Sequence, residues 1–133
     1  MELSTILFVA LGGSIGSVLR YLIANMGQSW TTSSFPLGTL VVNVIGCAAI
    51  GLITALLIRP LSQHREILRL VLIVGVLGGF TTFSSFAFDS IELFDDGRSG
   101  QAMLYIILTN VLGICAALLF YRGGTLLFDS STA

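Results

Sequence analysis

Four long apolar stretches constrain the fold of this 133-residue chain more than any other feature. They cover approximately residues 4–25, 37–58, 68–94 and 102–121. Each has the roughly 20 residues that an α-helix needs to cross a bilayer. The chain is 55% hydrophobic and only 10% charged, and its connecting segments are too short to hold a soluble domain. The sequence therefore predicts an all-α integral membrane protein in which residues 1–133 form a single four-helix transmembrane domain.

Charge and cysteine content narrow the range of functions. The chain carries six arginines, no lysine and seven acidic residues, for a net charge of −1, so we expect no nucleic-acid partner. Cys47 and Cys115 lie inside apolar runs without a CxxC spacing, and we interpret them as small core residues rather than as a disulfide or a metal pair. The single histidine lies in a loop, and no pair of acids lies in the middle of a span. We therefore expect no enzymatic activity.

The third apolar stretch is unusual in its middle. Residues 74–89 read VGVLGGFTTFSSFAFD, in which three glycines are followed by four hydroxyl residues among phenylalanines. Glycine costs about 1 kcal/mol relative to alanine inside a helix, and hydroxyl groups compete for helical hydrogen bonds. We expect an interruption near mid-membrane, where the freed carbonyl groups need a cavity or a bound ion. The alternative is a kink packed against small residues, since GxxxG motifs beginning at Gly12 and Gly75 both permit close helix approach.

Two polar residues lie inside the first and second spans. Asn43 follows Thr39 by four residues, so both project from one face of a helix. An asparagine at this depth either clasps a neighbouring helix or donates to a pore, and the spacing alone favours the clasp. Arg20 lies within or at the end of the first span, where it is either a functional residue or an arginine that snorkels to the interface.

The fourth stretch carries a polar stripe. Tyr105, Thr109 and Gly113 recur every four residues, and Asn110 lies beside them. Side chains at this spacing share one face of a helix. The stripe is either a narrow polar track or a packing seam in which the threonine bonds to its own helix. Residues after Arg122 form a short glycine-containing tail, which we expect to be frayed.

The polar inventory of the spans suits a passive route for a small ion. Hydroxyl and amide groups replace part of an ion's hydration shell, and phenylalanine rings have electropositive edges. Phe83 and Phe86 are three residues apart and share a helix face. A proton-coupled transporter would need an acidic residue within a span, and only Asp89 comes near this position. A neutral, donor-lined, aromatic path favours a small anion over a cation.

Three motifs carry a resemblance to a known family. GGSIGSVLRY at 12–21, PLGTLVVNVIG at 36–46 and GVLGGFTTFSSF at 75–86 together resemble the Fluc (CrcB) family of fluoride channels. Their order, spacing and the total chain length agree with that family, and the resemblance covers the four-span chain. This chain differs from the common family pattern at three positions: Ser85 replaces a threonine, Asp89 replaces a glutamate, and Gly113 replaces a serine of some members.

The resemblance implies a function and an assembly. It implies a passive, fluoride-selective channel of the bacterial inner (plasma) membrane that exports fluoride from the cytoplasm and lowers its toxicity. It also implies an antiparallel dual-topology homodimer with two fluoride pores and a central structural sodium ion (Na⁺). The weak arginine bias fits dual topology, because four arginines lie on the side of the termini and at most two on the other.

The resemblance also implies roles for individual residues. The backbone carbonyls of Gly78 and Thr81, two from each subunit, hold the sodium ion, and Arg20 lies near the pore vestibule. The residues that line the pores or bind fluoride are then Thr39, Asn43, Phe83, Phe86, Ser85, Tyr105 and Thr109.

Two other functions compete with the fluoride channel. One is a small proton-coupled multidrug exporter, a class that also uses four spans and dual topology. Those exporters have a membrane-embedded glutamate in the first span, and this chain has none after Glu2. The other is a non-conducting assembly subunit, whose polar residues only clasp helices together.

Overall fold

The computed structural model describes residues 3–31, 34–57 and 65–129, and these residues form helices joined by short connections. Four segments are long and apolar enough to cross a membrane: Leu3–Ser29, Leu37–Leu57, Glu66–Asp95 and Ser99–Leu127. The predicted four spans are therefore confirmed. The helices are α1 (Leu3–Ser29), α2 (Leu37–Leu57), α3 (Arg65–Leu68), η1 (Arg69–Leu77), α4 (Gly78–Phe80), α5 (Phe83–Asp95) and α6 (Ser99–Asp129).

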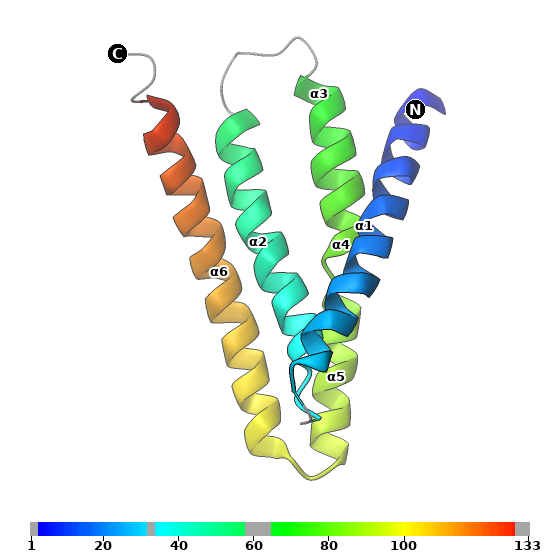
Figure 1. Ribbon diagram of the computed structural model, residues 1–133, viewed down its shortest axis with the longest axis vertical. Coiled ribbons are helices and arrows are strands. Elements are labelled where there is room, and N and C mark those ends of the chain that lie inside the picture. The colour runs from blue at the N-terminus through cyan, green and yellow to red at the C-terminus, as the bar shows by residue number, and fades with distance from the viewer. Residues whose placement is uncertain (1–2, 32–33, 58–64, 130–133) are drawn as a thin grey trace.

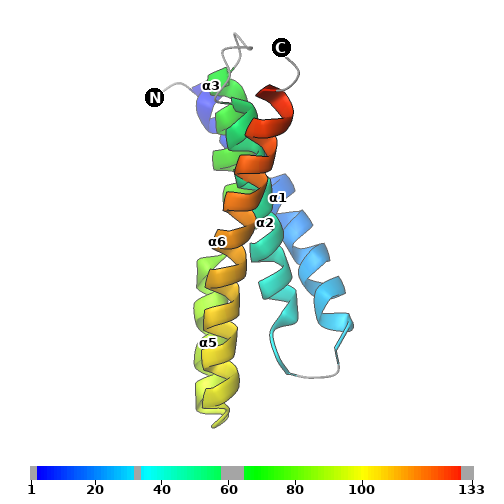
Figure 2. The same ribbon diagram turned by 90° about the vertical axis from the view of Figure 1, so that its left-hand side faces the viewer.

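The four spans run up and down beside one another. Figure 1 shows the start of α1 and the end of α6 at the same end of the molecule, as an even number of spans requires. α2 packs mainly against α6, and α1 packs mainly against η1 and α4. Towards the opposite end, α1 and α2 diverge from the pair formed by α5 and α6 (Figure 2).

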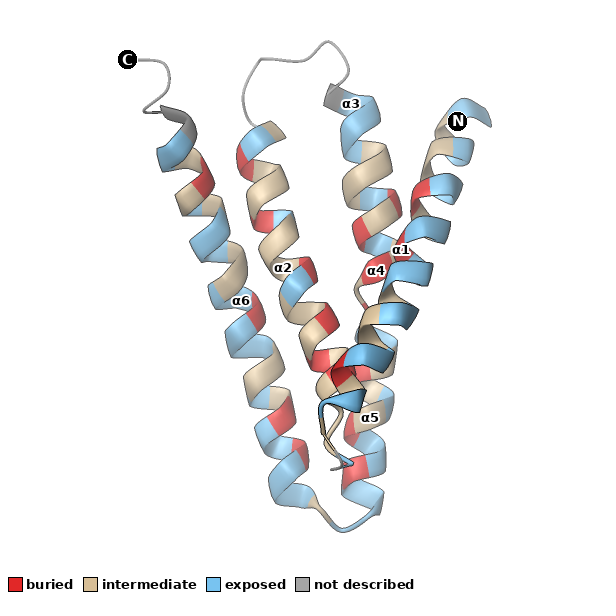
Figure 3. Ribbon diagram, viewed as in Figure 1, coloured by how far each residue is buried: buried red, intermediate tan, exposed pale blue. Residues whose placement is uncertain are grey.

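The outer faces of the spans are apolar and exposed. Large side chains such as Leu7, Leu11, Leu119 and Leu126 point outward, and exposed residues cover much of α1 and α6 in Figure 3. Such a surface is typical of a protein solvated by lipid, because lipid tails are as apolar as the side chains themselves. Both cysteines are free thiols; Cys47 is partly buried, but Cys115 is exposed on α6, so the prediction that both are core residues is wrong for Cys115.

The two GxxxG motifs meet face to face. A Cβ atom added to Gly12 would lie 2.5 Å from the Val71 carbonyl oxygen and 3.0 Å from the Gly75 Cα, and one added to Gly79 would lie 2.5 Å from the Gly13 carbonyl oxygen. Only glycine permits this backbone contact. The predicted close helix approach is confirmed, and its partners are α1 and the η1–α4 segment.

The first half of the third span is a π-helix, which the sequence did not predict. The Gly78 N–H bonds to the Ile73 carbonyl, five residues back. A wider turn of this kind brings residues five apart onto one face. Accordingly, the carbonyls of Val71 and Val76 both lie against the glycines of α1. The π-helix therefore sets the face that this span presents to α1.

The predicted fraying of the tail is wrong within the described residues, because α6 continues to Asp129. Two glycines in this region suggested a helix end. Gly124 instead lies against α2, where an added Cβ would be 2.8 Å from the Ala55 Cβ. The glycine serves close packing, and the helix continues through it.

The connection between α5 and α6 is a tight turn, in keeping with the polar and glycine residues of DDGRSGQ at 95–101. Gly97 adopts a positive φ of 72°. The N–H groups of Gly97 and Arg98 bond to the carbonyls of Phe94 and Leu93, at 3.0 and 2.9 Å. This is the glycine-dependent pattern that closes many helices, and it lets α6 return beside α5.

Candidate functional site

The third span is interrupted where the sequence predicts it. α4 ends at Phe80, Thr81 and Thr82 are extended, and α5 begins at Phe83. Asn43 of α2 bridges this gap: its Nδ2 donates to the Thr82 carbonyl at 3.0 Å, and its Oδ1 accepts from the Thr82 N–H at 2.9 Å. Asn43 is thus a clasp between two spans, and it satisfies both backbone groups of one interrupted residue.

The interruption leaves carbonyl groups without their helical donors. The helical donor for Gly78 would be the N–H of Thr82, which bonds to Asn43 instead. The donor for Thr81 would be the N–H of Ser85, which bonds to the Thr82 hydroxyl at 3.1 Å. Within residues 3–31, 34–57 and 65–129, no other group donates to either carbonyl. These are the two carbonyls that the family resemblance assigns to sodium.

Thr82 is a functional residue that the sequence analysis did not select. Its side chain caps α5 by accepting from the Ser85 N–H, and its hydroxyl also contacts the Ser84 and Ser85 hydroxyls at 3.3 and 3.1 Å. The residue is only 7% exposed. A threonine placed immediately before the first turn of a helix is a usual start signal, so this role was visible in the sequence.

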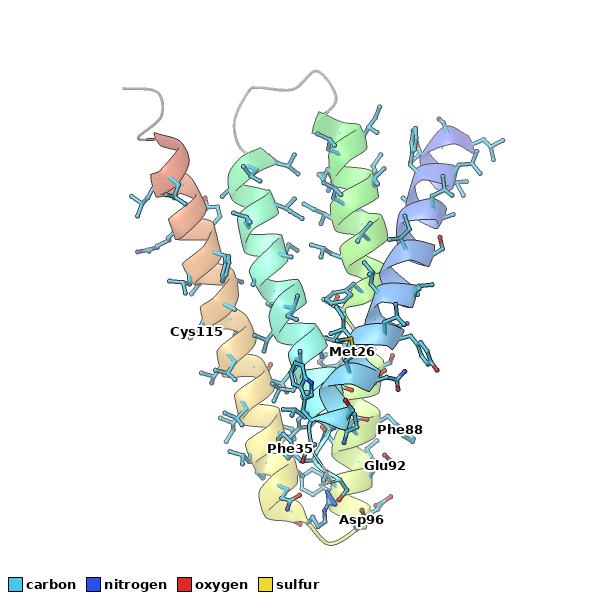
Figure 4. The ribbon with its side chains drawn as sticks, in the orientation of Figure 1. Met26, Phe35, Phe88, Glu92, Asp96 and Cys115 are labelled. Carbon is cyan, nitrogen blue, oxygen red and sulfur yellow. The ribbon has the colours of Figure 1, made fainter. Side chains whose placement is uncertain are left out.

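Phe83 and Phe86 begin a stack of aromatic rings. Their ring centroids are 5.4 Å apart, Phe86 lies 5.3 Å from Tyr105, and Tyr105 meets Phe35 edge-on at 5.7 Å. In Figure 4, Phe35 lies near the lower ends of α2 and α5. Phe86 and Tyr105 are buried, whereas Phe83 is 79% exposed. The two phenylalanines therefore have different environments within one chain.

Tyr105 is held by polar partners at the far end of the stack. Its hydroxyl donates to the Asp89 carboxylate at 3.0 Å, and the Thr39 side chain reaches the same hydroxyl. Tyr105 is fully buried. Asp89 thus has a hydrogen-bond partner inside the protein, and it also lines one cavity together with the acids at the end of the helix.

The acids at the end of α5 line a cavity of about 360 Å³ at the α5–α6 turn. Glu92, Asp95 and Asp96 are exposed, as expected for solvated acids. Figure 4 shows Glu92 pointing away from α5 and Asp96 near the turn. Arg98 donates to the Ser34 hydroxyl and lies 3.9 Å from the Asp96 carboxylate. This arginine ties the α5–α6 turn to the chain that precedes α2.

A larger cavity of about 380 Å³ opens beside the interruption. It brings together residues from α2, the broken third span and α6, and none of them carries a charged side chain. Thr109 contributes a buried hydroxyl oxygen without a hydrogen-bond partner in the described chain. The cavity is lined by Asn43, Gly46, Cys47, Ile50, Ile73, Leu77, Gly78, Thr81, Thr82, Phe83, Phe86, Thr109, Asn110, Gly113 and Ile114.

The predicted site residues fall into three groups. Asn43, Gly78, Thr81, Phe83, Phe86 and Thr109 line this cavity. Thr39 and Tyr105 lie at the Asp89 end of the aromatic stack, and Ser85 joins the Thr82 hydroxyl network. Arg20 is separate: it is partly exposed on α1 and borders neither cavity.

Comparison with known proteins identifies the family. Residues 7–121 match the family described as CrcB-like protein, Camphor Resistance (CrcB). The chain belongs to the CrcB family. CrcB relatives that carry the name Fluoride-specific ion channel FluC include a protein of Agrobacterium fabrum, 47% identical over 84% of this chain and 88% of its own length. One from Thermus thermophilus is 44% identical over 90% of this chain and 95% of its own length, and one from Aquifex aeolicus is 43% identical over 85% and 90%.

Family membership and the four helices together identify a multi-pass membrane protein, which in bacteria belongs to the inner membrane. The match begins near the start of α1 and ends near the close of α6, so it contains the interruption and both of its neighbours. The motifs that carried the resemblance all lie within it.

Proposed function

We propose that this chain is a fluoride-specific ion channel that lets fluoride leave the cytoplasm down its electrochemical gradient. The observation that carries the proposal is the cavity at mid-membrane depth, whose mainly apolar lining holds several hydroxyl and amide groups but no charged side chain. Relatives at 43–47% identity over most of the chain bear the name of such a channel. Transport of this kind is passive, so the protein is not an enzyme.

The donors in this region suit a small anion. The Thr109 and Ser85 hydroxyls and the second hydrogen of the Asn43 amide are available as polar donors, and the edges of Phe83 and Phe86 supply weakly positive ring hydrogens. The Tyr105 hydroxyl instead donates its single hydrogen to Asp89. Hydrogen-bond donors replace water around an anion. Without a fixed positive charge the anion is not trapped, so it leaves as readily as it enters. Arg20, on α1, attracts anions towards the entrance.

The cavity is open on one side in a single chain, which supports a homodimer. Phe83 is 79% exposed, and Gly78 and Asn110 are exposed at the same opening. Polar backbone and amide groups cannot face lipid without a large cost. A second copy in antiparallel orientation would close the opening by two-fold symmetry and form two equivalent pores.

A structural sodium ion fits the donors at the interruption. The Gly78 and Thr81 carbonyls have lost their helical donors. Neutral carbonyl oxygens are good ligands for an alkali-metal ion because they replace its hydration shell. Two carbonyls from each copy would hold the ion between the subunits, and its charge would offset the cost of the orphaned oxygens.

Passive fluoride efflux from liposomes tests the proposed function. Purified protein is reconstituted in liposomes loaded with sodium fluoride, and external fluoride is followed with an electrode. We expect rapid fluoride efflux, with chloride retained in parallel liposomes. Efflux of both anions would exclude a selective channel. An absence of efflux from folded protein would exclude the channel altogether.

Two further arms of the same experiment test the sodium ion and the competing exporter. Replacing sodium by a large organic cation on both sides is expected to lower fluoride efflux and to weaken the dimer. Unchanged efflux and assembly after complete exchange would remove the sodium proposal. A proton-coupled exporter would need an acidic residue within α1, which has none from Leu3 to Ser29, and its transport would follow an imposed pH gradient.

A further inference from the structure

Asn110 is a polar residue of α6 without an assigned role. It is exposed at the rim of the large cavity, beside Thr109 and one turn before Ile114. One amide hydrogen bonds to the carbonyl of Ile106, in its own helix, at 2.8 Å. No other described residue contacts its amide, so its oxygen and second hydrogen remain for a partner outside this chain.

The depth of Asn110 excludes lipid as that partner. The fourth span runs from Ser99 to Leu127, so its midpoint is Gly113, and Asn110 lies about 5 Å from this level at 1.5 Å per residue. Water from the ends of the span reaches this level only through the cavity, and Asn110 lies at the rim of that cavity. Lipid tails offer no hydrogen bond, and an amide that faces them is costly.

We propose that Asn110 is an assembly contact, whose amide hydrogen-bonds to a second copy of this chain. The inference rests on the antiparallel homodimer of the proposed function. In such a dimer the two-fold axis lies in the plane of the bilayer, so residues near mid-depth at the interface lie closest to the axis. Asn110 meets both conditions, because it is near mid-depth and borders the opening that the second copy closes.

Asn25 provides a matched control. It is also an exposed asparagine whose Nδ2 bonds to a carbonyl four residues back, that of Tyr21, at 2.9 Å. It lies only four residues before the end of α1 at Ser29, where water and lipid headgroups are available. Replacing either asparagine by leucine removes the same local bond, and only Asn110 lies near the middle of the bilayer.

The test measures assembly and transport separately. Wild type, Asn110→Leu and Asn25→Leu are reconstituted in sodium, and the dimer dissociation constant is measured by single-molecule photobleaching over a range of protein-to-lipid ratios. Because symmetry removes the contact twice, we expect Asn110→Leu to raise the constant about tenfold or more. We expect Asn25→Leu to change it less than twofold. Fluoride efflux is recorded from the same liposomes and divided by the number of dimers.

The outcomes distinguish this inference from the proposed function. If Asn110→Leu dimerises with the wild-type dissociation constant, the assembly role is overturned, whatever its fluoride efflux. A loss of efflux in that case would place Asn110 on the ion route instead. A wild type that dimerises but shows no fluoride efflux would contradict the channel and leave the assembly contact standing. Should the leucine variant lose helical content by circular dichroism, Asn110→Ala is measured in its place and is held to the same two outcomes.

Discussion

Asn43 pairs with the extended backbone of Thr82 in the third span as a neighbouring β-strand would. Its amide exchanges two hydrogen bonds with the N–H and carbonyl of Thr82. Thr82 is nearly inaccessible, so without Asn43 neither backbone group would reach water. A side chain on one helix thereby offsets the free-energy cost of an interruption in another helix at mid-membrane depth.

Replacing Asn43 by alanine should therefore weaken the fold and stop transport. Two buried backbone groups would lose their partners, at about 1–3 kcal/mol each. We expect a lower melting temperature in detergent and little fluoride efflux. Asn25→Ala, which removes only an exposed bond within α1, serves as the control. Equal melting temperatures for the two variants would contradict the role of Asn43 as a clasp.

The unequal burial of Phe83 and Phe86 predicts unequal effects of the same substitution. Phe86 is 8% exposed and packs between Phe83 and Tyr105, so Phe86→Ile should destabilise the protein by about 1–3 kcal/mol. Phe83 is 79% exposed within one chain, so Phe83→Ile should leave chain stability within about 0.5 kcal/mol. Both should lower fluoride efflux, as measured in liposomes beside denaturation curves. Normal efflux from both variants would rule out a route along the rings.

At the scale of the helices, glycines decide which spans come close. α1 meets η1 and α4 through backbone contacts at Gly12 and Gly79, whereas α2 meets α6 at Gly51 and Gly124. The third span is thus held from one side by α1 and clasped from the other by α2. This arrangement fixes the interruption in space although the residues at the break are not helical.

Gly12→Ala should destabilise the pair formed by α1 and η1. The new Cβ would lie 2.5 Å from the Val71 carbonyl oxygen, and because the obstacle is backbone we expect a loss of about 1–3 kcal/mol. Gly100 at the start of α6 has open space around it. Gly100→Ala should therefore be neutral or stabilising by up to about 1 kcal/mol. Unfolding titrations of both variants check the difference, and similar curves would refute the packing argument.

The sequence predicts the spans and the interruption because their signals are local. Twenty apolar residues identify a span, and glycines followed by hydroxyl residues identify the break at Thr81. The clasp was favoured for Asn43, although its partner residue could not be deduced from spacing. The π-helix of residues 69–77 has no sequence signal of its own. The tail after Arg122 was wrongly predicted to fray because the packing of Gly124 against Ala55 is a long-range contact.

At the scale of the whole molecule, the single chain has two kinds of exposed surface. Most of it is apolar and suits lipid. The opening beside the interruption instead presents Gly78 and Asn110 near the centre of the span. A monomer surrounded by lipid would leave these polar groups without partners. This surface supports the proposed homodimer.

An antiparallel homodimer requires that the same chain inserts in both orientations. The arginine bias between the two ends is weak, four against at most two, which leaves insertion weakly directed. We expect cytoplasmic and periplasmic reporters fused to the C-terminus to be active at comparable levels. The matched control adds three lysines to the same end of the chain, which should drive one orientation and reduce fluoride efflux. A single orientation for the unmodified chain would contradict the antiparallel dimer.

The interruption has one more consequence, which concerns the helix macrodipole. Where α4 ends at Phe80, the carbonyls of its last turn, that of Gly78 among them, form a partial negative pole, and where α5 begins at Phe83, its first N–H groups form a partial positive pole. Both poles face the middle of the bilayer, beside a cavity lined without charged side chains. One break in one helix thereby offers electrostatic partners to ions of either sign. Since each pole carries only a fraction of a charge, it can attract an ion without holding it as tightly as a full charge would.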